Sequence, residues 1–128
     1  MSRWLSEAWF AERLAEVDDH PVRSGVDGRL QLEVTGGPEG DVSAYWELAD
    51  GRPVGGGPGR TDAPDVTLTA TWSDAVAMER GELDPNVAFM QGRLKVAGSM
   101  GLVLELLPLA RTPEDRERRR QAAALTEF

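Results

Sequence analysis

Few side chains in this chain are suited to catalysis or metal binding. The sequence contains one histidine, His20, and no cysteine, which excludes disulfides, cysteine nucleophiles, thiolate metal sites and clusters of histidine ligands. A Ser/His/Asp triad would have to use His20. That residue precedes Pro21 at the end of a predicted helix, where an end-cap or surface role is favoured. Few combinations of nucleophile and base are left, so we expect no enzyme, no metal site and no cofactor.

Two pairs of carboxylates are close together in the sequence. Asp18 adjoins Asp19, and Glu82 stands two residues before Asp84. General acid–base catalysis requires one carboxyl of a pair to lie in an apolar pocket with a displaced pKa. Both pairs fall at predicted helix ends and loops, so we interpret them as solvated helix caps.

A glycine-rich stretch and a basic run are the remaining motifs. The stretch "GGGPG", residues 55–59, could cradle a phosphate with its backbone amides. A phosphate loop needs a following helix and usually a lysine, whereas Arg60 leads through a loop into a predicted strand. We therefore predict a flexible hairpin connection. The run "RERRRQ", residues 116–121, contains Glu117 and lies on a polar helix, which favours a solvated face.

Length and charge narrow the class of partner. The chain has 128 residues and a formal net charge of −8 at pH 7, and we predict a single domain over residues 1–128. This charge repels nucleic acid and anionic bilayers, so neither is expected as the main partner. The N-terminus lacks the apolar core of a signal peptide, and no window reaches the roughly 18 apolar residues of a membrane span. We expect a cytoplasmic protein with no integral membrane segment.

The pattern of apolar residues predicts an α+β fold. Alternation with a period of two predicts strands, and helical spacing between capping residues predicts helices. One face of the strands is polar, which predicts a mostly antiparallel five-stranded sheet with helices packed on the other face. The expected elements are an N-terminal helix at about 3–19; strands at 29–35, 42–48, 52–54, 65–72 and 93–97; helices capped by Ser73, Asp84 and Ser99; and a polar C-terminal helix at about 113–127.

The helix that follows Ser99 is apolar on nearly all sides. One stripe comprises Met100, Val103, Leu104 and Leu107, and a second, almost opposite, comprises Leu102, Leu106 and Leu109, with Glu105 as the only charge. A two-layer fold cannot bury both stripes against its sheet alone. The second stripe therefore meets another helix in a plain core, a partner chain or an apolar ligand. Methionines near it, at positions 78, 90 and 100, suit an adaptable apolar site.

The run "DVTLTATWSDAVAMERGELDPNVAFMQGRLKVAGSMGLVLEL", residues 65–106, resembles the sterol carrier protein type 2 (non-specific lipid-transfer protein) family. The resemblance rests on a threonine-rich strand that opens on Asp-Val, on Gly-x-Leu-Asp-Pro at 81–85, on Phe89 and Met90, and on Gly-x-Leu-x-Val-x-Gly at 92–98 before the apolar helix. Over residues 3–48, the order of a helix followed by strands also agrees.

The resemblance implies a fold, a ligand class and a location. It implies a five-stranded antiparallel sheet with helices on one face and an apolar tunnel between the layers. That tunnel would bind or transfer a sterol, fatty acid or fatty acyl-CoA without catalysis. The chain ends "LTEF" rather than with a peroxisomal Ser-Lys-Leu address, so we expect a bacterial cytoplasmic protein. The residues expected to bind the ligand are Met78, Phe89, Met90, Leu94, Met100, Val103, Leu104 and Leu107.

A different class of function uses the same apolar surface. The fold could serve as an accessory, scaffolding or dimerisation module, in which the apolar stripe docks a partner enzyme or a second copy of the chain. No lipid is required in that case.

Overall fold

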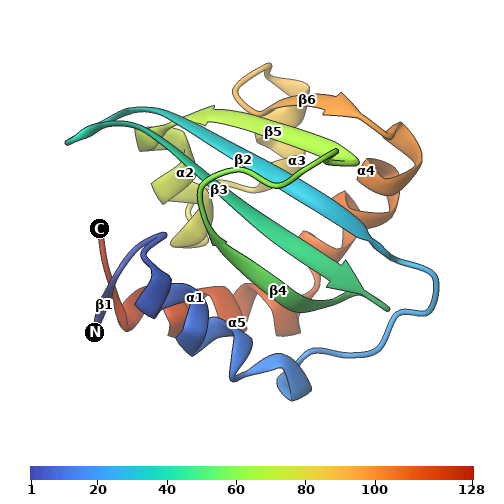
Figure 1. The fold of residues 1–128 in the computed structure, drawn as a ribbon. Coiled ribbons are helices and arrows are strands. Elements are labelled where there is room, and N and C mark those ends of the chain that lie inside the picture. The colour runs from blue at the N-terminus through green and yellow to red at the C-terminus, as the bar shows by residue number, and fades with distance from the viewer.

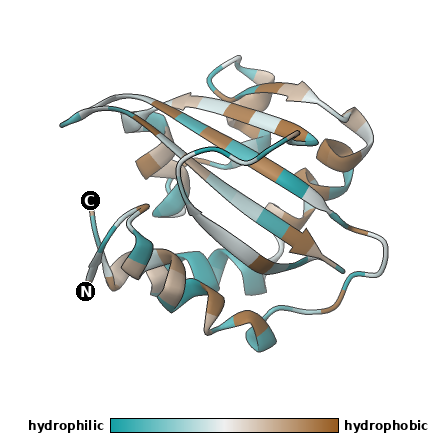
Figure 2. Ribbon diagram, in the orientation of Figure 1, coloured by the Kyte–Doolittle hydropathy of each residue, from teal (hydrophilic) through white to brown (hydrophobic).

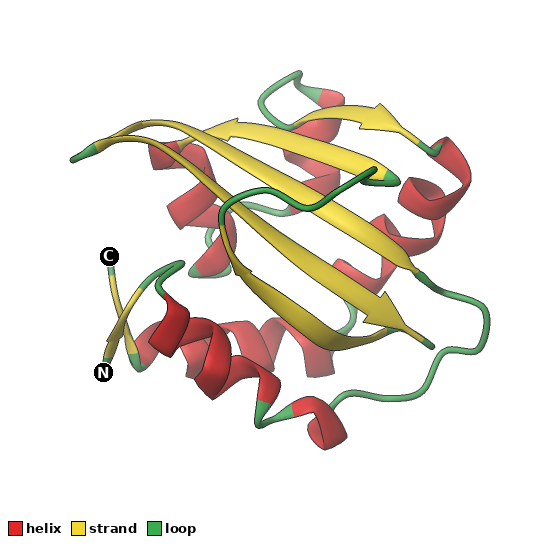
Figure 3. Cartoon of the chain, in the orientation of Figure 1, coloured by secondary structure: helices red, strands yellow, loops and turns green.

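The computed structural model describes all residues from Met1 to Phe128. A sheet forms one layer and the helices cover one of its faces (Figures 1 and 3). No helix combines the length and the apolar character that crossing a bilayer requires. In chain order the elements are β1 Ser2–Arg3, α1 Glu7–Leu14, the 3-10 helix η1 Val17–Asp19, β2 Gly28–Gly37, β3 Gly40–Ala49, β4 Arg52–Pro58, β5 Val66–Thr71, α2 Trp72–Glu79, α3 Pro85–Met90, β6 Lys95–Gly98, α4 Met100–Leu106, the 3-10 helix η2 Leu107–Arg111, α5 Pro113–Ala124 and β7 Thr126–Glu127.

The main sheet has five strands in the order β4-β3-β2-β5-β6. Three of its four pairings are antiparallel, and the central pair β2–β5 is parallel. The predicted α+β class with a mostly antiparallel five-stranded sheet is therefore confirmed. Leu30 in β2 lies opposite Trp46 in β3 and Val66 in β5, so the inward-facing side chains of neighbouring strands form continuous rows. Figure 2 shows the matching alternation of hydrophobic and hydrophilic residues along β2.

The connection from β4 to β5 crosses the sheet face opposite the helices (Figure 1). It must cross because β4 is an edge strand and β5 lies on the far side of β2. Gln31 of β2 fixes this crossing: its Nε2 donates to the carbonyl oxygens of Ala44 at 3.0 Å and Gly59 at 3.1 Å, and its Oε1 accepts from the Thr61 amide at 2.9 Å. Gln31 is therefore buried, although its place in the strand alternation predicts a solvated residue.

The apolar core consists of two clusters on the helix-covered face. The larger joins α1, α2 and α3 to the sheet through Trp4, Leu5, Trp9, Phe10, Val34, Ala44, Ala70, Ala75, Val76, Ala88 and Leu94. The smaller joins α4 to the sheet through Val26, Leu30, Val66, Leu102 and Val103. Trp46, Leu68 and Val96 pack against both clusters, so the core is continuous along the sheet.

The two ends of the chain differ from the predicted helices at about 3–19 and 113–127. Helix α1 begins only at Glu7, because Ser6 caps it by accepting from the Trp9 amide. Residues 2–3 form β1 instead, which pairs in parallel with β7 at residues 126–127. Leu5 has a φ of 64°, a left-handed conformation that turns the chain from β1 into α1. The N- and C-termini therefore lie side by side (Figure 1).

The prediction of a flexible loop at residues 55–59 is wrong, because residues 55–58 belong to strand β4. A Cβ on Gly56 would lie 2.9 Å from Trp46 Cε3 and 3.0 Å from Phe10 Cδ1. Only glycine leaves enough room for these rings of β3 and α1 to pack against the edge strand. The ring centroids of Phe10 and Trp46 are 4.7 Å apart. The glycines therefore bring α1 close to the sheet.

The helix caps follow the sequence signals at two of three positions. Asp84 caps α3, with Pro85 at its first turn, and Ser99 caps α4, as predicted. The predicted cap at Ser73 is wrong. Thr71 accepts from the Asp74 amide and starts α2 at Trp72, because the strand β5 leads into the helix without an intervening loop.

Candidate functional site

A cavity of about 490 Å³ lies between the inner face of the sheet and the helices α1, α5 and η2. Its lining residues come from every layer around it and are Trp9, Arg13, Glu16, Asp19, His20, Leu30, Trp46, Leu48, Gly51, Pro53, Glu79, Leu106, Leu109, Ala110, Asp115, Arg118, Arg119, Gln121, Ala122 and Leu125. The terminal helices α1 and α5, far apart in sequence, thus enclose one space.

One wall of the cavity is apolar. Leu30, Trp46 and Leu48 line it from the sheet, and Trp9 lines it from α1. Leu106 at the end of α4 adds to this wall, and Leu109 and Ala110 extend it along η2. Trp9 and Trp46 meet edge to face, with ring centroids 5.8 Å apart. This wall can bury the apolar part of a ligand.

The helices around the cavity also carry charged side chains, most of which are already paired. On α1, Arg13 lies 3.6 Å from Glu16 and donates to the Ala122 carbonyl of α5 at 3.4 Å. On α5, Asp115 lies 3.6 Å from Arg118 and 3.0 Å from Arg119. These positive charges are therefore compensated within the protein.

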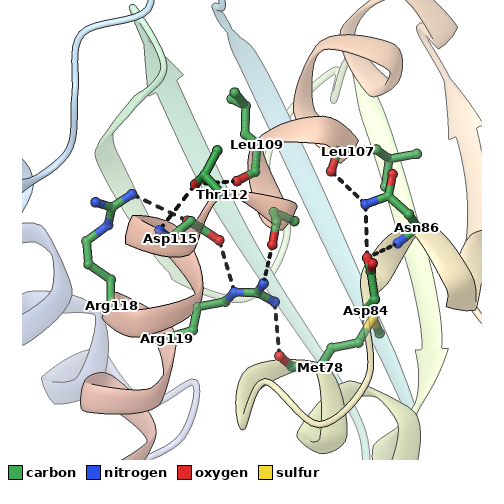
Figure 4. A network of polar contacts seen from close by, with 10 residues as sticks. Met78, Asp84, Asn86, Leu107, Leu109, Thr112, Asp115, Arg118 and Arg119 are labelled. Carbon is green, nitrogen blue, oxygen red and sulfur yellow. Dashed lines mark hydrogen bonds and ion pairs between the residues drawn. The ribbon is translucent and has the colours of Figure 1, made fainter.

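Arg119 holds α5 in place over the cavity (Figure 4). Its guanidinium donates to the Met78 carbonyl of α2 at 3.1 Å and to the Ala110 carbonyl of η2 at 2.6 Å. Thr112 adds a cap to the same helix by accepting from the Asp115 amide at 3.2 Å. One side chain thus joins three elements that surround the cavity.

Glu79 and His20 are the cavity residues with displaced pKa values. Burial raises the pKa of Glu79 to about 7; Arg119 and Arg13 lower it and Asp115 raises it, but burial dominates. Burial also lowers the pKa of His20, and Arg118 lowers it further. No hydrogen bond or ion pair satisfies the Glu79 carboxyl within the protein.

None of the eight residues predicted to bind a ligand lines the cavity. Leu94 and Val103 are buried in the two core clusters, and Met78, Phe89 and Leu107 are half-buried. Met90, Leu104 and Met100 lie on the surface, with exposed fractions of 82%, 66% and 46%. A role for these eight residues in ligand contact stays a prediction.

The cavity instead uses the second stripe of the apolar helix. Leu106 and Leu109 line it, while Leu102 packs in the smaller core cluster. The sequence did mark Leu106 and Leu109, because they belong to the second apolar stripe of this helix. For Trp46 the only signal was its inward position in the strand alternation, and for Trp9 there was none.

The fold and the site together define a class of protein. A helix-covered sheet with a cavity lined by both apolar and charged side chains is suited to hold an amphiphilic small molecule. A model of the SCP-2 sterol transfer family matches residues 10–111, which is most of the chain. The chain belongs to this family.

A curated relative agrees with the family. Sterol carrier protein 2 of Rattus norvegicus is 32% identical over 105 residues, which cover 80% of this chain and 19% of that protein. The chain thus spans about a fifth of the length of the curated relatives it matches.

Two solved structures share the fold. The palmitated SCP2L2 of Aedes aegypti has a TM-score of 0.64 at 22% identity, covering 83% of this chain and 94% of that one. A crystal structure of sterol carrier protein 2 has a TM-score of 0.68 at 18% identity, covering 94% and 97%. At these identities the likeness concerns the fold alone.

Proposed function

We propose that the protein binds and carries an apolar lipid-like ligand, a fatty acid, fatty acyl-CoA or sterol, in the cavity between the sheet and α1, α5 and η2, without chemical change. The observation that carries this proposal is the cavity itself, with Leu30, Trp46, Leu48 and Leu106 along one wall. Its volume of about 490 Å³ lies in the range of roughly 300–1,000 Å³ that is usual for small-molecule sites.

Hydrophobic burial supplies enough free energy for such binding. Each buried methylene contributes about 0.8 kcal/mol, so a sixteen-carbon chain offers on the order of 12 kcal/mol before the costs of ordering both partners. Micromolar affinity corresponds to about 8 kcal/mol. Family membership and the likeness to sterol carrier protein 2 of Rattus norvegicus support the same ligand class.

Displacement of a fluorescent fatty acid by palmitate and by cholesterol tests this proposal. We expect dissociation constants in the micromolar range for at least one of the two lipids, and native mass spectrometry should show one lipid per chain. Absence of uptake of either lipid at tens of micromolar would contradict it.

The alternative, docking of a protein partner or a second copy, relies on the exposed apolar residues of α3 and α4. Met90 and Leu104 are the most exposed of these. The comparisons give this alternative no support. A mass measurement by size exclusion distinguishes the two: lipid carriage requires only a monomer, whereas docking of a second copy requires a dimer. Cytoplasmic localisation and a bacterial origin stay predictions of the sequence.

A further inference from the structure

Glu79 is the half-buried charged residue of the cavity that the protein itself leaves without a partner. It ends α2 and lines the cavity. The neighbouring charges are paired: Arg13 with Glu16, and Asp115 with Arg118 and Arg119. Asp19, which also lines the cavity, has no ion pair either but is exposed to water. A partly desolvated carboxyl without a partner is stabilised when it is neutral or when it accepts a hydrogen bond from a donor.

A ligand that reaches the charged side of the cavity meets the carboxyl of Glu79, which has no partner in the protein. The Nε atoms of Arg13 and Arg118 also lack a hydrogen-bond partner, but they are closed off from the cavity, and the other nitrogens of these arginines are engaged by Ala122, Glu16 and Asp115. A neutral hydroxyl group supplies the donor that Glu79 lacks. An anionic head group has no donor and meets an ionised Glu79 as a like charge.

We infer that Glu79 sets the head-group specificity of the cavity: it accepts a hydrogen bond from a neutral hydroxyl head group and, when ionised, excludes an anionic one. This inference rests on the proposed function. It makes Glu79 a specificity-determining residue and the preferred ligand a long-chain or polycyclic alcohol at alkaline pH.

The pH dependence follows from the groups that face Glu79. Arg13 from α1 and Asp115 and Arg119 from α5 act on its charge. Glu16, Asp19, His20 and Arg118 line the same cavity. The arginines keep their charge throughout. His20, whose pKa is lowered from 6.5, is already mostly neutral above pH 6.5. Glu79, with a pKa of about 7, loses its proton between pH 6 and 8, and the Glu79→Gln variant separates its effect from that of His20.

Two ligands of equal chain length and fixed charge test the inference. Hexadecanol is neutral, and hexadecanesulfonate stays anionic at every pH used, so neither ligand titrates. Each is measured by displacement of an uncharged fluorescent lipid, below the micelle concentration, at pH 6 and pH 8. We expect the sulfonate affinity to fall about tenfold, following the protonated fraction of a group with a pKa near 7, and the hexadecanol affinity to stay constant.

Glu79→Gln supplies the decisive variant, because it keeps the shape of the side chain and removes the titration. We expect it to bind the sulfonate equally at both pH values. The control Glu82→Gln removes one carboxylate at an exposed position outside the cavity and should keep the wild-type pH profile. The wild-type comparison requires no variant, so a folding defect cannot mask the result.

The possible results distinguish failure of the Glu79 inference from failure of the proposed lipid carriage. If both ligands bind but change in parallel with pH, or if Glu79→Gln retains the wild-type profile, the inference is wrong and lipid carriage stands. If neither ligand binds at either pH, lipid carriage fails and the inference fails with it.

Discussion

Leu106 and Leu104 are two leucines of one helix with different surroundings. Leu106 lines the cavity, whereas Leu104 has an exposed fraction of 66%. Leu106→Arg places a charge in the cavity and removes an apolar contact for the ligand. We expect it to weaken acyl-chain binding at least tenfold in a displacement titration.

Leu104→Arg is the matched control, and it should leave both binding and the unfolding midpoint close to wild type. A loss of binding from Leu104→Arg equal to that from Leu106→Arg would show that the ligand lies against the outer stripe. That result would support the eight residues predicted from the sequence.

Gly56 lets the rings of Trp46 and Phe10 pack against strand β4 more closely than any side chain would allow. Gly56→Ala would place its Cβ 2.8 Å from the Tyr45 carbonyl oxygen and 2.9 Å from the Trp46 ring. Relief of this overlap should cost about 1–3 kcal/mol of unfolding free energy, measured by urea denaturation. At Gly57 the nearest atom is the Tyr45 hydroxyl at 3.5 Å. Gly57→Ala should therefore change stability by less than about 0.5 kcal/mol; equal effects at both positions would contradict the packing argument.

Residues whose role is local could be predicted from the sequence, and residues whose role depends on distant segments could not. Asp84 and Ser99 cap the helices that directly follow them, so their spacing to the next turn sufficed. Gln31 alternates as a solvated strand residue, but a segment about thirty residues later covers it. Only the sheet order places that segment there.

At the scale of elements, the position of α5 depends on Arg119. Arg119→Met keeps the aliphatic stem but removes the hydrogen bonds to Met78 and Ala110 and the ion pair with Asp115. Hydrogen bonds from a charged donor contribute roughly 1.5–3 kcal/mol. We expect a loss of about 2–3 kcal/mol in unfolding free energy. Amide exchange should accelerate in α5 before it does in the sheet.

The control for this change lies one residue further along the same helix. Arg120 is exposed and pairs only with Glu117, at 3.2 Å, so Arg120→Met should alter stability by less than about 0.5 kcal/mol. If exchange in α5 is unchanged in Arg119→Met, the contacts of Arg119 do not hold the helix.

The spacing of apolar residues predicts individual elements but not how they are arranged. This spacing predicted the existence of five strands and of the apolar helix, because each element has its own period. It could not choose which side of α4 meets the cavity, since Leu104 and Leu106 are equally apolar. It also could not reveal the parallel β2–β5 pair, because pairing between distant strands leaves no trace in either strand alone.

At the scale of the whole molecule, Glu79 makes stability depend on pH. Its pKa is raised from 4.5 to about 7 in the folded protein, so between these values the folded state binds more protons than the unfolded state. The stabilising contribution of Glu79 to the unfolding free energy is therefore fully present below pH 4.5 and is lost as the pH rises through 7. We expect the loss to be on the order of 3 kcal/mol, measured by urea denaturation between pH 5 and pH 8.

Glu79→Gln removes this dependence, because glutamine does not titrate. Its unfolding free energy should fall less than that of the wild type over the same pH range, and at pH 8 the variant should be the more stable of the two. If the unfolding free energies of the wild type and the variant change by the same amount between pH 5 and pH 8, the Glu79 carboxyl is not buried.

The short ladder between β1 and β7 decides how the molecule responds to mechanical force. Tension applied to both chain ends pulls on parallel strands from opposite directions, so it loads the bonds from the Ser2 amide to Leu125 and from the Trp4 amide to Glu127 together, in shear. The next restraint is the bond from the Trp9 indole to Thr126. These contacts are far fewer than those between the ten-residue strands β2 and β3. We therefore expect tension on the chain ends to break the β1–β7 ladder before it breaks the pairing of β2 with β3.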